Sequence, residues 1–163
     1  MGKHTPYFEL LEAQGMAGCP ICRLVYKVTD RYLDAILYEA VLDPDVRAKL
    51  KGSRGFCDEH VEMLRRKPGR ALGIALIYRD IIRSVAETTD AARFQGDTSP
   101  IRKLLGKRQH NVQVIEKLAA SVDCPACGIG QGAADNYLDL LLAYLDDEQL
   151  YRAYAEGEGL CLP

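Results

Sequence analysis

The segment Cys19–Cys22 (Cys-Pro-Ile-Cys) occurs a second time in the same chain, as Cys124–Cys127 (Cys-Pro-Ala-Cys). Each copy is followed by a further cysteine motif: Gly55–His60 (Gly-Phe-Cys-Asp-Glu-His) after the first and Gly159–Pro163 (Gly-Leu-Cys-Leu-Pro) after the second. These motifs contain all six cysteines of the chain. Three cysteines and one histidine make a complete tetrahedral ligand set for zinc. The repeated motif therefore predicts a fold organised by metal sites.

The cysteine motifs belong to a longer internal duplication. Tyr32–Asp34 and Tyr137–Asp139 share the sequence Tyr-Leu-Asp and stand at the same distance from their cysteine pairs. Such identities in one register indicate a duplicated unit. We expect a single domain of two pseudo-symmetric halves over residues 1–163, with repeat 1 at about 19–60, linker helices at 61–121 and repeat 2 at about 124–163.

The apolar residues follow helical spacing. Leu33, Ile36 and Leu37 begin one such stripe, and no segment alternates with the period of a strand for long. A capping residue followed by proline marks helix starts at Asp43–Pro44 and Ser99–Pro100. The pattern predicts an all-α fold, with helices near residues 6–14, 20–42, 44–51, 58–67, 70–94, 100–121, 125–146 and 147–156.

Composition narrows the function classes. The formal charge of -2 over 163 residues gives no general attraction to nucleic acid or to anionic lipid, so neither is an expected partner. The first twenty residues lack the apolar stretch of a signal peptide, and no apolar segment is long enough to span a membrane. We therefore expect a cytoplasmic protein, whose cysteines bind metal or do redox work. Three disulfides in an exported protein remain the alternative.

The first expected site consists of Cys19, Cys22, Cys57 and His60. In Cys-Pro-x-Cys the first cysteine caps a helix and the second lies one turn on, where the helix dipole favours thiolates. Zinc is the expected ion, since it takes sulfur and nitrogen ligands tetrahedrally. An iron–sulfur cluster remains open. So does a redox pair resembling that of thioredoxin-like oxidoreductases, although the βαβ context of those enzymes is not indicated.

The second expected site has three cysteines, Cys124, Cys127 and Cys161. The repeat predicts its fourth ligand, a histidine, at position 164, so we expect the chain to be a fragment at that end. His4 and His110 are weaker candidates for the missing ligand. An open fourth position is also the layout of catalytic zinc, which leaves open whether the protein is an enzyme.

Two other features are set aside. Gly128–Ala133 (Gly-Ile-Gly-Gln-Gly-Ala) superficially fits a dinucleotide fingerprint, but that motif requires a preceding strand. Basic residues cluster around 65–70 and 102–110, where a solvated helix face is the simpler interpretation.

Taken together, the motifs resemble those of an uncharacterised bacterial family, a domain of unknown function. The resemblance rests on Lys3–Leu10 (Lys-His-Thr-Pro-Tyr-Phe-Glu-Leu) together with the four cysteine motifs, and it covers nearly the whole chain. It implies a helical fold with two metal sites and no known activity.

From the residues we expect a zinc-binding protein whose structural sites serve an interaction or regulatory module. A protein partner and association in pairs are left open. The alternatives are a thiol or iron–sulfur redox protein and a zinc enzyme.

Overall fold

The computed structural model describes residues 3–96, 116 and 118–161. This part of the chain contains seven helices and no strand, which confirms the expected all-α class. The helices are α1 (Thr5–Gln14), α2 (Pro20–Tyr38), α3 (Pro44–Gly52), α4 (Asp58–Arg65), α5 (Ala71–Gly96), α8 (Pro125–Ala143) and α9 (Glu148–Glu156).

Local chemistry starts these helices where the sequence predicts. Helices α2, α3 and α8 each begin at a proline, which suits the first turn because its missing N–H has no partner there. The Asp43 carboxylate accepts hydrogen bonds of 2.9 Å from the backbone N–H groups of Asp45 and Val46 at the start of α3. Asp147 likewise accepts from the N–H of Leu150 at the start of α9, at 3.2 Å.

Helices at corresponding places in the two expected repeats have equal lengths. Helices α2 and α8 have 19 residues each and follow equivalent Cys-Pro dipeptides. Helices α3 and α9 have nine residues each and follow the two capping aspartates. The starts of α2 and α8 are 105 positions apart in the sequence, and those of α3 and α9 are 104 positions apart.

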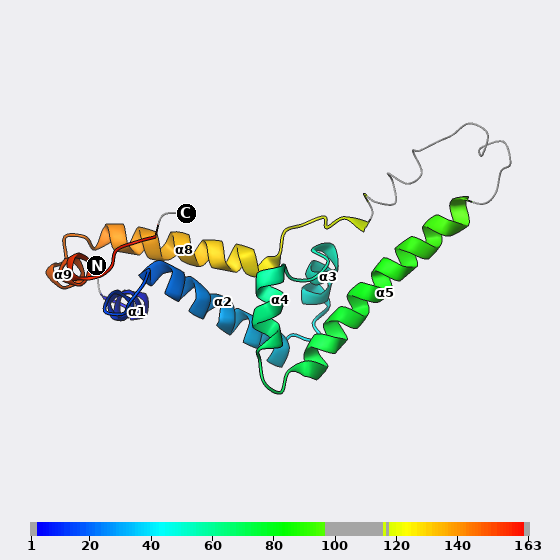
Figure 1. The fold of residues 1–163 in the computed structure, drawn as a ribbon, viewed down its shortest axis with the longest axis horizontal. Coiled ribbons are helices and arrows are strands. Elements are labelled where there is room, and N and C mark those ends of the chain that lie inside the picture. Colours follow the sequence, from blue (N-terminus) through cyan, green and yellow to red (C-terminus); the bar gives the residue numbers. More distant parts are fainter. Residues whose placement is uncertain (1–2, 97–115, 117, 162–163) are drawn as a thin grey trace. The chain divides into compact units, whose positions relative to one another are not determined.

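Contacts divide the chain into two compact units, and each is described by itself. The first comprises residues 1–34 and 126–163. In it α2 and α8 lie side by side (Figure 1), with Gly130 of α8 close to Val25 and Thr29 of α2. Helix α1 packs against α9. The buried core of this unit is formed by Tyr7, Leu10, Ala13, Ile21, Leu24, Tyr137, Leu141 and Leu150.

Two buried tyrosines tie the first unit together through carboxylates. The hydroxyl of Tyr7 donates to Asp147 Oδ1 at 2.7 Å, and Lys3 pairs with Asp147 Oδ2 at 2.8 Å. The hydroxyl of Tyr137 donates to Glu9 Oε2 at 2.6 Å. These bonds connect the start of the chain to α8 and to the start of α9.

The second unit comprises residues 35–125, in which α3 packs against α5. Arg47 of α3 pairs with Asp80 of α5 at 2.6 Å, and both side chains are largely shielded from solvent. Among the described residues of this unit, the buried apolar side chains are Ile36, Leu37, Leu50, Phe56, Met63, Leu64, Ile77 and Ile81.

A glycine turn between α3 and α4 directs the chain toward the cysteine motif. Gly55 has a φ of 101°, and a Cβ at this position would lie 3.2 Å from the ring of Tyr78. Both the left-handed backbone and the close approach require glycine. The turn places Cys57 at the start of α4.

The observed bounds differ little from the predicted ones. Helix α2 ends at Tyr38 rather than at residue 42, and α8 ends at Ala143 rather than at residue 146. The predicted helix at 100–121 lies mostly outside the described residues. Among the described residues, no helix combines the length and the apolar character that crossing a membrane requires.

Candidate metal centres

The first centre begins at the N-terminus of α4. Cys57 is the N-cap residue, with extended backbone and no capping hydrogen bond from its side chain. His60 lies in the first turn of the same helix, is 7% exposed, and places its Nδ1 2.9 Å from the Sγ of Cys57. The motif Cys-x-x-His thus puts both ligand atoms on one side of a helix start.

Cys124 joins this pair from a distant part of the sequence. Its Sγ lies 3.7 Å from His60 Nδ1, and it stands directly before Pro125, the first residue of α8. Cys127 follows within the first turn of that helix, so helix geometry holds it near Cys124. The ligand atoms of Cys57, His60, Cys124 and Cys127 all lie within 4.8 Å of one another.

Both cysteine motifs of this centre lie at helix starts. The backbone N–H groups at the starts of α4 and α8 carry the positive ends of the helix dipoles. The pKa of Tyr78 is raised first by burial and then by electrostatic interaction with Cys124 and Cys57.

The second group lies within the first unit and consists of Cys19, Cys22 and Cys161, whose sulfurs are also within 4.8 Å of one another. The sulfurs of Cys22 and Cys161 are 3.2 Å apart. A hydrogen bond of 2.7 Å from the backbone N–H of Gly18 to Glu158 holds the segment after α9 beside the start of α2.

The pKa values of Cys19 and Cys22 are shifted in opposite directions. Burial disfavours the Cys19 thiolate, but hydrogen bonds from the backbone N–H groups of Cys161 and Cys22 outweigh it and lower the pKa of Cys19 to about 7. The pKa of Cys22 is raised to about 12, because its hydrogen bonds to Cys161 and Cys19 favour the protonated thiol. A bound cation would favour the ionised form of Cys22, because it compensates the negative charge of a thiolate.

This grouping differs from the one expected from the sequence. Cys57 and His60 were expected beside Cys19 and Cys22, but in the structure they lie with Cys124 and Cys127. Cys161 was expected with the second Cys-Pro-x-Cys pair and lies with the first. Each Cys-Pro-x-Cys pair is thus grouped with the later cysteine motif of the other repeat.

The weaker histidine candidates have separate outcomes. His4 is exposed, precedes α1, and belongs to neither group. His110 lies outside the described residues. None of the six cysteines is joined in a disulfide.

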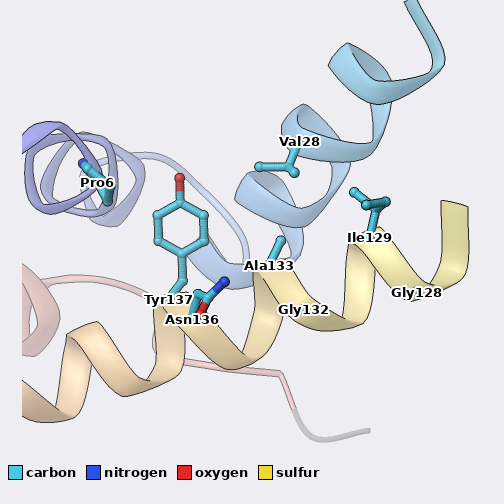
Figure 2. Close-up of a pocket in the computed structure, with 8 residues that line it drawn as sticks. All are labelled: Pro6, Val28, Gly128, Ile129, Gly132, Ala133, Asn136 and Tyr137. Atoms are coloured by element: carbon cyan, nitrogen blue, oxygen red, sulfur yellow. The ribbon is translucent and has the colours of Figure 1, made fainter. Parts of the chain in front are cut away.

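A separate apolar cavity of about 420 Å³ opens in the first unit beside α8. Figure 2 shows Tyr137 reaching from α8 toward α1, with Val28 and Ile129 facing each other across α2 and α8. Burial, followed by the hydrogen bond to Glu9, raises the pKa of Tyr137 to about 12. The cavity is lined by Pro6, Val28, Gly128, Ile129, Gly132, Ala133, Asn136 and Tyr137, none of which belongs to either cysteine group.

The interactions of Tyr7 and Tyr137 with carboxylates are not evident from the sequence. The carboxylates that accept these hydrogen bonds lie more than a hundred positions away in the sequence, and no local motif indicates the pairing. The glycine run at 128–132 does have a structural outcome: it lies inside α8 and is helical.

Comparison with known proteins gives a family but no activity. The chain is 25% identical over 147 residues to an "Uncharacterized 23.9 kDa protein in xynA 3'region" of Caldicellulosiruptor sp. (strain Rt8B.4). The match covers 88% of this chain and 61% of the relative, so the chain spans less than two thirds of the relative's length. No solved structure matches residues 1–163 of this chain. Residues 6–163 match a family of unknown function, DUF6062, and the chain therefore belongs to that family.

Proposed function

We propose that this is a zinc-binding helical protein in which the metal is structural and holds helix starts together. The observation that carries the proposal is the convergence of Cys57, His60 and Cys124, with Cys127 one helical turn further on. Residues 57 and 124 are far apart in the sequence, so the fold itself gathers this ligand set.

The donor set and its spacing suit zinc. Two ligands bound to one zinc at about 2.0–2.3 Å stand roughly 3.3–3.8 Å apart in tetrahedral geometry. The distance of 3.7 Å between Cys124 Sγ and His60 Nδ1 agrees with this spacing. The shorter distance between Cys57 Sγ and His60 Nδ1, 2.9 Å, requires the histidine ring to shift slightly as it binds.

The number of ligands favours a structural role for this centre. Four protein ligands fill the tetrahedral coordination of zinc and leave no position for a substrate or a reactive water. The metal would bind the folded ligand set and not an unfolded chain, so its binding free energy would add to the free energy of folding.

The same reasoning extends to Cys19, Cys22 and Cys161. The sulfur atoms of three cysteines lie within 4.8 Å of one another and form a sulfur-rich site. Sulfur ligands select zinc, whereas magnesium and calcium bind to oxygen ligands. We propose that this group binds a second zinc ion.

The reduced cysteines bear on the cellular compartment of the protein. Cysteines that must stay reduced to bind metal belong in a reducing compartment, and we propose the cytoplasm. We further propose that the metal-stabilised helices present a surface to a protein partner or to a second copy of the chain, as an interaction or regulatory module.

Elemental analysis by plasma mass spectrometry, combined with a visible spectrum, tests the proposal. We expect zinc in the purified protein and a colourless solution. His60→Ala should lose one zinc per chain, whereas the control His4→Ala, at an exposed histidine outside both groups, should lose none. Iron with visible colour would replace the proposal by an iron–sulfur protein, and a metal-free protein would refute it.

A further inference from the structure

We infer that Cys22 and Cys161 form a redox pair that a peroxide converts to a disulfide, with release of the metal that they would hold. Formation of the disulfide depends only on the two thiols. Release of metal rests on the proposed zinc binding. The Cys-Pro-x-Cys motif does not predict this pair, because Cys22 and Cys161 belong to different repeats.

The geometry needs only a small movement. The sulfurs of Cys22 and Cys161 are 3.2 Å apart, and a disulfide bond measures about 2.05 Å. Cys22 is fixed in the first turn of α2, but Cys161 lies in non-helical chain after α9. Gly159 in that segment has a φ of 76° and open space where a Cβ would stand, so small backbone rotations there meet little resistance.

Access to solvent distinguishes this pair from the other cysteines near it. Cys22 and Cys161 are both exposed, whereas Cys19 is partly buried and packs against the core of the first unit. In the other group Cys127 is also exposed, but Cys57 and Cys124 are partly buried around the buried His60. Within the group of Cys19, Cys22 and Cys161, an oxidant from solvent therefore reaches Cys22 and Cys161 before Cys19.

The chemistry balances with one peroxide. One thiol attacks a peroxide oxygen, the O–O bond breaks, and a sulfenic acid and one water form when the peroxide is hydrogen peroxide. The second thiol attacks the sulfenic sulfur, the S–S bond forms, and a second water leaves. The two cysteines together lose two electrons and two protons, and the peroxide takes up both. With its two exposed ligands joined, the group retains one thiolate and cannot hold its ion.

Peptide mapping after treatment with one equivalent of hydrogen peroxide tests the inference in the full chain. Trypsin leaves Cys19 and Cys22 together in residues 4–23 and Cys161 in residues 153–163. We expect these two peptides to be cross-linked in metal-free protein. Cys19→Ser should keep the cross-link, and Cys22→Ser should abolish it. In zinc-loaded protein a chromogenic chelator should detect the release of one equivalent as the cross-link forms.

The outcomes separate the two proposals. A protein that binds zinc but forms no cross-link between these peptides refutes the redox pair alone. A cross-link that survives in Cys22→Ser and disappears in Cys19→Ser also refutes it. A protein that forms the expected cross-link but never binds zinc supports the pair and refutes the proposed metal function. Fragmentation of the native cross-linked peptides assigns the bonded sulfurs even if a variant fails to fold.

Discussion

At the scale of single residues, Asp147 combines three interactions in one carboxylate. It accepts from the buried hydroxyl of Tyr7, pairs with Lys3, and caps α9 through the N–H of Leu150. The hydrogen bonds from Lys3 and Tyr7 lower the pKa of Asp147 to about 2. The folded protein therefore binds this proton more weakly than the unfolded chain does.

This pKa predicts a pH dependence of stability. Ionised Asp147 stabilises the fold above about pH 4, near the ordinary pKa of an aspartate, and the stabilisation is lost as the pH falls from about 4 to 2. In thermal melts, Asp147→Asn should remove this part of the decline. Asp146→Asn, at the exposed neighbouring aspartate, should decline as the native protein does. Identical pH profiles for native protein and Asp147→Asn would refute this account of the carboxylate.

At the scale of the helix, two glycines of α8 have different surroundings. Gly130 and Gly132 both lie within it. A Cβ on Gly130 would stand 3.3 Å from Thr29 Oγ1 and 3.4 Å from Val25 on α2, but a Cβ on Gly132 would meet nothing within 4 Å. Only Gly130 is needed for the close approach of α2 and α8.

The two glycines should therefore respond differently to alanine. Gly132→Ala should raise the free energy of unfolding by about 0.5–1 kcal/mol, because alanine favours the helix and restricts the unfolded chain. Gly130→Ala gains the same propensity but crowds α2, so its gain should be smaller or reversed. Urea unfolding of the two variants measures the difference. Equal stabilisation by both substitutions would show that α2 and α8 are not in close contact at Gly130.

The helices were predictable because their signals are local. A proline in the first turn, an aspartate cap and apolar residues three and four apart act within a few residues of one another, and they fix α2, α3, α8 and α9. The ends of α2 and α8 were placed a few residues too late. Ala40 and Val41 continue the apolar pattern, but the chain has already left the helix there.

At the scale of the whole molecule, the cysteines and the histidine that come together were predictable, but their grouping was not. Residue type and spacing identify Cys57 and His60 as a pair, because both lie at one helix start. Which Cys-Pro-x-Cys pair they join depends on the path of the chain. Helix α2 carries the chain about 28 Å away from Cys19, and the nine residues of α3 span only about 13 Å. In a duplicated chain, pairing within a repeat and exchange between repeats leave the same sequence pattern.

Exchange of ligands between the repeats would make each metal centre depend on both repeats. If each ion needs ligands from both repeats, neither repeat completes a metal centre alone. Folding and metal binding would then be linked across the length of the sequence.

The zinc content of Cys57→Ala, Cys124→Ala and the double variant, measured by plasma mass spectrometry after mild chelation, tests this account most directly. Cys57 and Cys124 both belong to one proposed ligand set. Each of the three proteins should therefore lose the same single zinc, with a fall in Tm on the order of 10 °C in each. A double variant that loses twice the zinc of either single variant, or a Cys124→Ala protein that retains all of it, would contradict the exchange of ligands between the repeats.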